Sequence, residues 1–381
     1  MSRTMTVQEC DHAVQELLPE LPRPEQKALA ALVSGVVVEQ EACVSRASAG
    51  MPGDAQDRSK QRRAQRLLAN PRLDVPRAQR RVLARVLAGR RGRLDLLLDA
   101  TTTGATAQQA GTVSLVLAVA WHGRALPLVW RTWTADEPGQ DWRRAIRQMC
   151  ATVQAALPPH VQVVLLADRG LTGAPLAHLT QELGWHYVWR VQGQTRVCHP
   201  NGTVSPISAL APRPGRQCCL TAVRVWAPRR KGEHWVSDWD EAPCANIVAL
   251  WRPVDKEPWL LVTDLPATLA RCADYRRRTW EEELFRDLKS FGWQWQRSRV
   301  RRPERVERLL LVLTLATLWV VCLAQRVLRR GWRPSIEERS RRCYSYFQLG
   351  LRWLTRQLAN DLPVHCTFRL WSESAAPLKL S

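Results

Sequence analysis

Four side chains between residues 275 and 289 are spaced so that one face of a helix could hold a phosphate group. Arg278, Glu282 and Lys289 follow Tyr275 at offsets of three, seven and fourteen residues. Because each residue of an α-helix turns the chain by about 100°, all four side chains fall within an arc of about 60°. Cations can hold phosphate oxygens while a carboxylate holds a metal ion. The spacing therefore predicts a phosphodiester site on this face; a solvated helix with incidental ion pairs is the alternative.

The acids that neighbour Glu282 point elsewhere on the same helical wheel. Glu281, Glu283 and Asp287 lie outside the arc, so Glu282 is the acid predicted to share the face with the two cations. The opposite side of the helix is apolar and is predicted to be buried: Trp280, Leu284, Leu288 and Phe291.

Two further carboxylates are predicted to end β-strands. Asp99 follows the run RLDLLL, and Asp168 follows the wholly apolar run VQVVLLA. Asp95 is the competing first acid, but it is predicted to lie in the middle of its strand. Alone, either aspartate could be a turn or capping residue. Together with Glu282 they form a set of three hard oxygen donors, which suits two Mg²⁺ or Mn²⁺ ions in phosphoryl transfer.

The composition favours a nucleic-acid partner. The chain has 381 residues, with 56 Lys and Arg against 35 Asp and Glu, for a net charge of +21. A basic field spread along the chain attracts polyanions. The eleven cysteines are scattered and show no zinc spacing, so we expect reduced thiols and a cytoplasmic protein. The apolar run 309–324 is too short for a membrane span and is predicted to be a core helix.

The order of apolar patterns predicts an α/β fold with a mixed sheet. Strands are expected at 94–98, 113–121, 126–133, 161–167 and 186–191, with helices after the third and fourth, giving the order βββαβαβ. Long helices are expected at 303–329 and 335–359. The predicted regions are a helical DNA-binding region 1–90, the first part of the catalytic domain 91–193, a β-rich insertion 194–264, the remaining catalytic domain 265–329 and a helical C-terminal region 330–381. A helical packing appendage is the alternative for the first region.

With these motifs the chain resembles the DDE transposases of bacterial insertion sequences, specifically insertion-sequence family four with its Y-x2-R-x3-E-x6-K signature. Tyr275, Arg278, Glu282 and Lys289 match the signature in full. The segments starting at Asp99 and Asp168 are similar to the family's first and second motifs, and the resemblance covers roughly residues 90 to 325.

The resemblance implies a ribonuclease H-like fold in which Asp99, Asp168 and Glu282 bind Mg²⁺, or Mn²⁺ in its place. It implies cleavage at the terminal inverted repeats, transfer into target DNA and a synaptic homodimer, with Tyr275, Arg278 and Lys289 on phosphates. Trp259 resembles a tryptophan that stacks on a flipped base in related enzymes, although a core position is equally open.

Two other functions are compatible with the same residues. A ribonuclease H-like nuclease would cut DNA without strand transfer, and a transposase-derived DNA-binding protein would not cut at all. The motifs GxxxxGK[ST] and HExxH are absent from the sequence, so neither a P-loop nucleotide site nor a zinc protease site is expected. We expect no association with a membrane.

Overall fold

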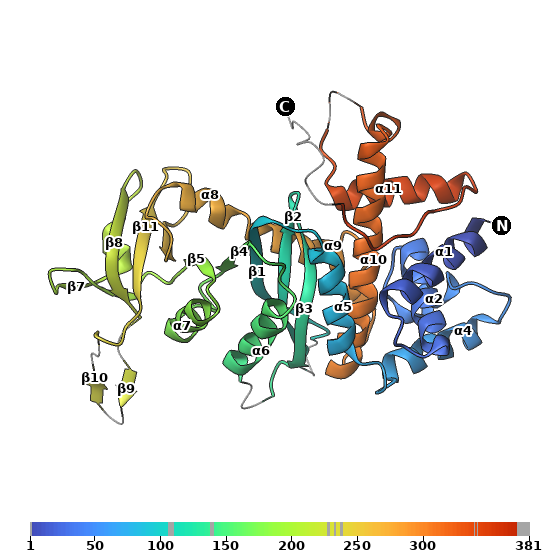
Figure 1. The fold of residues 1–381 in the computed structure, drawn as a ribbon, viewed down its shortest axis with the longest axis horizontal. Helices are drawn as coiled ribbons and strands as arrows, with labels where there is room; N and C mark the ends of the chain where they lie inside the picture. The colour runs from blue at the N-terminus through green and yellow to red at the C-terminus, as the bar shows by residue number, and fades with distance from the viewer. Residues whose placement is uncertain are drawn as a thin grey trace.

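A computed structural model describes residues 2–105, 110–137, 141–226, 229–231, 234–236, 239–338, 340 and 342–371. Within these ranges the chain forms a mixed α/β structure around one large sheet, which helices cover on its faces and at one end (Figure 1). The predicted mixed α/β class is confirmed.

The first half of the sheet has the predicted order of strands and helices. Its elements are β1 Gly92–Thr103, β2 Thr112–Trp121, β3 Arg124–Thr134, α6 Trp142–Gln154, β4 Val161–Ala167, α7 Ala174–Glu182 and β5 His186–Arg190. The first three strands form antiparallel pairs, whereas β4 lies parallel to both β1 and β5. The apolar β4 is buried in the centre, as its unbroken run of aliphatic residues predicts.

The strands that follow β5 extend the same sheet. They are β6 Arg196–Cys198, β7 Val204–Pro206, β8 Gln217–Val225, β11 Cys244–Leu250 and β12 Trp259–Thr263, with the short helix η1 Ile207–Leu210 between β7 and β8. Strand β12 pairs antiparallel with β5, which gives the continuous order β3-β2-β1-β4-β5-β12-β11-β8-β6-β7. A separate two-stranded ribbon is formed by β9 Arg229–Lys231 and β10 His234–Val236.

Five helices precede the sheet. They are α1 Ser2–Leu17, α2 Arg23–Glu39, α3 Val44–Ala49, α4 Asp57–Ala69 and α5 Val75–Leu87. Helix α4 is rich in basic residues, and its buried side chains are Ala64, Leu67 and Leu68. Helices α2, α4 and α5 all pack against α10; α10 and α5 also pack on β3 of the sheet (Figure 1).

The elements that follow β12 are helices. They are α8 Ala270–Arg276, α9 Thr279–Leu288, η2 Trp295–Arg297, α10 Pro303–Arg329, η3 Arg333–Ser335 and α11 Tyr346–Ala359. Helix α9 packs on β1, β2 and β3, and α11 packs on α10. The predicted helix 303–329 is confirmed. By length and composition α10 could cross a membrane, but 94% of its most apolar window is buried inside the protein, as in a core helix.

Two predictions about the C-terminal half are wrong. The predicted helix 335–359 begins only at Tyr346, because Ser345 caps it through a reciprocal capping box with Gln348. Phe291 was expected to be buried, but 61% of it is exposed. It lies beyond the end of α9, so the helical wheel no longer describes its direction. Its ring packs instead under the Arg286 guanidinium.

Candidate active site

Asp99 and Asp168 lie side by side because their strands are parallel neighbours. Leu98 on β1 is paired in register with Ala167 on β4, so the next residue on each strand reaches the same level of the sheet. Asp168 directly follows β4, as predicted. Asp99 was expected to end its strand, but β1 continues to Thr103 through its pairing with β2. The longer strand holds Asp99 on a rigid element.

The helix predicted from residue 275 to residue 289 is in fact two helices. Helix α8 ends at Arg276 and α9 begins at Thr279, so Arg278 lies in the turn between them. Lys289 is the first residue after α9. A single helical wheel is therefore the wrong geometry for this segment. Tyr275, Arg278, Glu282 and Lys289 nevertheless all face the same end of β1 and β4, because the turn redirects α8 toward β5 while α9 lies across β1.

Arg278 joins the three predicted acids. Its Nη2 lies 2.8 Å from Asp99 Oδ2 and 3.4 Å from Asp168 Oδ2, and its Nη1 donates to Glu282. The Arg278 side chain is 12% exposed, and the exposed fraction rises from 20% at Asp99 to 30% at Asp168 and 54% at Glu282. The acids therefore form the wall of an open site with the guanidinium between them.

The surroundings of Asp99 favour the uncharged form of its carboxyl, in comparison with an aspartate exposed to water. Burial raises the pKa of the Asp99 carboxyl, the Arg278 guanidinium acts to lower it, and the charges of Asp168 and Glu282 raise it again. Carboxylates that raise one another's pKa in this way bind a cation more favourably than an anion, since added positive charge relieves their repulsion.

Tyr275 and Lys289 complete the side of the site that faces the helices. The Tyr275 hydroxyl donates to Asp168 Oδ1 at 3.1 Å, and burial raises the pKa of this phenol, so that it stays protonated. The Lys289 Nζ donates to the Thr102 carbonyl at 3.0 Å, and burial lowers the pKa of the amine. Each therefore has a partner at the end of β1 or β4.

Trp259 lies beside this group at the start of β12. Its ring meets the Tyr275 ring edge to face, with centroids 5.7 Å apart, and it is only partly buried. The Arg252 guanidinium lies 5.6 Å from the Trp259 ring centroid. The indole is thus neither a fully buried core residue nor a free surface residue.

The competing acids have other partners or other surroundings. Asp95 pairs with Arg277 at 2.5 Å and with Arg93 at 2.7 Å, outside the group around Arg278. Glu283 pairs with Arg286. Glu281 is fully buried, and burial raises the pKa of its carboxyl well above the usual range. Burial thus disfavours the charged carboxylate that a hard cation binds.

The three carboxylates are the kind of ligand that suits a hard divalent cation, although the Arg278 guanidinium now lies between them. No group of three candidate ligands within the described part of the chain is already close enough to hold a metal ion. Three carboxylates turned toward one guanidinium nevertheless define a position that requires positive charge. Carboxylate oxygens are the ligands that Mg²⁺ and Mn²⁺ prefer.

Sequence reasoning missed an ion-pair cluster beside Asp168. Arg169 and Arg190 both reach Glu257, at 2.6 and 2.7 Å, and so tie the turn after β4 to β5 and to the loop before β12. These residues are far apart in the sequence, and only the order of strands in the sheet brings them together. The sequence feature that could have indicated Arg169 is the tripeptide DRG at 168–170, directly after the predicted strand 161–167.

Residues 90–319, more than half of the chain, match a family model described as the transposase DDE domain. No curated protein matches the chain.

Proposed function

Because the chain belongs to the transposase DDE domain family, we propose that it cuts DNA at the terminal inverted repeats of an insertion sequence and transfers the cut ends into target DNA. The observation that carries the proposal is the convergence of Asp99, Asp168 and Glu282 on Arg278. Three acids around one position, with a second cation at Lys289, suit a phosphodiester with its metal ions better than they suit a structural ion pair.

Asp99, Asp168 and Glu282 would hold Mg²⁺, or Mn²⁺ in its place, with two ions as the expected number. Two such ions supply the positive charge that an in-line phosphoryl displacement requires at its attacking and leaving oxygens. Arg278 is then free to bind a phosphate oxygen of the DNA, which its planar guanidinium can do with two hydrogen bonds. Tyr275 holds Asp168 in place through its hydroxyl.

The finer identity that we propose is insertion-sequence family four, supported by the complete Y-x2-R-x3-E-x6-K spacing from Tyr275 to Lys289. A ribonuclease H-like catalytic domain formed by 91–193 and 265–329 is part of this proposal, with 194–264 inserted between its two parts. Trp259, at the end of that insertion and against Tyr275, is the proposed stacking partner of a displaced base.

The remaining regions have proposed roles in assembly. The helical region 1–90 binds the double-stranded ends of the element, and 330–381 completes the helical side of the molecule. We propose that two copies of the chain act together, one on each end of the element, in the bacterial cytoplasm. The net charge of +21 supports a DNA partner for the whole chain.

Cleavage of a linear DNA that carries the element's inverted repeats tests the proposal. With Mg²⁺ present, the wild-type protein is expected to cut at the repeat ends, and Glu282→Gln is expected to reduce cutting to background. Glu283→Gln is the matched control, because it removes a neighbouring charge that pairs with Arg286 on another face. Equal cutting by wild type and Glu282→Gln would contradict the proposal.

Pre-cut ends separate the alternatives. A transposase joins the free 3′ hydroxyl of a pre-cut end to target DNA, whereas a nuclease without strand transfer leaves it unjoined. A non-catalytic DNA-binding protein binds the repeats and neither cuts nor joins them, with or without divalent metal.

A further inference from the structure

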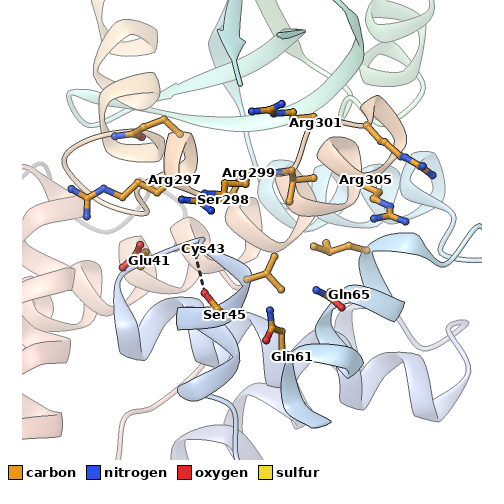
Figure 2. A pocket seen from close by; sticks show the side chains of 15 residues that line it. Glu41, Cys43, Ser45, Gln61, Gln65, Arg297, Ser298, Arg299, Arg301 and Arg305 are labelled. Carbon is orange, nitrogen blue, oxygen red and sulfur yellow. Dashed lines mark hydrogen bonds between the residues drawn. The ribbon is translucent and has the colours of Figure 1, made fainter. Parts of the chain in front are cut away.

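An arginine-lined groove lies between the N-terminal helices and the segment that connects α9 to α10. Its volume is about 810 Å³. One wall comes from α3, α4 and the residues just before α3; the other comes from residues 296–305 (Figure 2). The walls are more than 200 residues apart in the sequence, so only the packing of α4 and α2 on α10 creates the groove.

The second wall carries most of the charge. It contributes five arginines, whereas Glu41 is the single acid among the described residues that line the groove. The arginines are Arg297, Arg299, Arg301, Arg302 and Arg305. The first four are exposed and the fifth is partly buried. Five guanidinium groups and one carboxylate give the groove an excess of positive charge, so an anionic ligand with several charges would stabilise the arrangement.

The first wall adds uncharged groups that donate hydrogen bonds. Gln61 and Gln65 lie four residues apart on the same face of α4, and Ser45 lies near the start of α3. Figure 2 shows the two amide side chains on the wall opposite the labelled arginines. Amide and hydroxyl side chains contact phosphate and sugar oxygens in protein–DNA complexes, where they position the backbone without selecting a sequence.

One residue of the groove, Arg301, lies beside the end of β1, the strand that carries Asp99. The Cγ of Arg301 lies 3.5 Å from the position that a Cβ would take on Gly104, which follows β1. Two residues earlier, the Thr102 carbonyl accepts from Lys289 Nζ. Lys289 and Arg301 therefore both lie at the end of β1, which places one arginine of the groove near the candidate active site.

We propose that this groove binds the phosphate backbone of the DNA segment adjacent to the bond held at Asp99, Asp168 and Glu282. The inference rests on the proposed function for the identity of the polymer. Guanidinium groups bind phosphate oxygens in pairs of hydrogen bonds, and their repeated placement along one wall suits a ligand with regularly spaced phosphates. The groove thus anchors the DNA and leaves chemistry to the carboxylates.

DNA binding by a protein that cannot cut tests the groove. In a Glu282→Gln background, Arg297→Ala/Arg299→Ala removes two groove charges. The matched control is Arg143→Ala/Arg144→Ala, which removes two exposed charges from α6, outside the residues that line the groove. The fluorescence anisotropy of a labelled duplex of arbitrary sequence is measured at several salt concentrations in the presence of EDTA.

The groove variant is expected to lose roughly tenfold or more in affinity at 0.1 M salt, and the slope of log K against log salt should become less steep by about 1.8, or about 0.9 for each lost phosphate contact. The Arg297→Lys/Arg299→Lys variant should keep most of the slope because it keeps the charge. Equal affinities and slopes for groove and control variants would overturn the inference. So would polyglutamate displacing the duplex at an equal concentration of charge, because the groove would then recognise no feature of DNA.

These outcomes are separate from those of the proposed function. A wild-type protein that binds DNA through the groove but never cuts would refute transposition and leave the groove intact. A protein that cuts normally when the groove charges are absent would refute the role of the groove and leave the proposed transposition intact.

Discussion

Arg278 and a divalent cation should compete for the same three carboxylates, and Arg278→Ala tests this directly. The substitution leaves Asp99, Asp168 and Glu282 facing one another without their shared partner. Loss of one partner from a fully buried ion pair costs about 3–5 kcal/mol, and from an exposed pair at most about 1 kcal/mol. Because Asp99 is mostly buried and Glu282 is half exposed, we expect a loss of about 2 kcal/mol. In a chain of 381 residues this corresponds to a fall in Tm of about 2–3 °C in EDTA.

Added Mg²⁺ should reverse most of this loss. A cation that binds only the folded state at one hundred times its Kd stabilises it by about 2.7 kcal/mol. In the wild type the guanidinium opposes metal binding, so the rise in Tm with Mg²⁺ should be larger in Arg278→Ala. Arg277→Ala is the matched control, since Arg277 pairs with Asp95 instead. Thermal unfolding with and without Mg²⁺ measures the effect. An equal rise in Tm on addition of Mg²⁺ in Arg278→Ala and Arg277→Ala would refute the competition between Arg278 and the cation.

Three further substitutions test other parts of the structure. Burial raises the pKa of Asp287 to about 7, above its unfolded value, so ionisation of this carboxyl destabilises the folded protein as pH rises toward 7. Asp287→Asn should therefore be more stable than wild type at pH 8 and nearly equal to it at pH 4. A difference in Tm between the two proteins that does not change with pH would contradict this. In Gly350→Ala the new Cβ would lie 1.9 Å from the Val320 carbonyl oxygen, so the crossing of α10 and α11 must open at a cost of about 1–3 kcal/mol, which urea denaturation measures. Tyr275→Phe removes a hydrogen bond to Asp168, for which we expect a loss of DNA cutting of roughly tenfold or less; background activity would indicate a larger role for the hydroxyl.

Local patterns in the sequence predict much of the fold. The aliphatic run at 161–167 is buried strand β4, and the run from residue 303 is the core helix α10, with Pro303 in its first turn. The order of strands and helices up to β5 also follows from alternation and periodicity. These features depend on residues close together in the sequence, so they can be predicted from the sequence alone.

The geometry of the candidate site depends on contacts that sequence patterns do not contain. The turn at Arg278 interrupts a segment whose spacing fits one unbroken helix, and the extension of β1 beyond Asp99 depends on its pairing with β2. The role of Arg278 as the common partner of three acids requires the parallel register of β1 and β4. The arginine groove requires the packing of α2 and α4 on α10.

The central claim is that Asp99, Asp168 and Glu282 hold one metal site, and metal-directed cleavage of the protein backbone tests it most directly. Fe²⁺ replaces Mg²⁺, and ascorbate with peroxide generates radicals that cut the chain near the bound ion. Cuts are expected near all three acids, and both excess Mg²⁺ and Glu282→Gln should weaken the cuts at all three positions. Cuts elsewhere in the chain, or an unchanged pattern in Glu282→Gln, would contradict it.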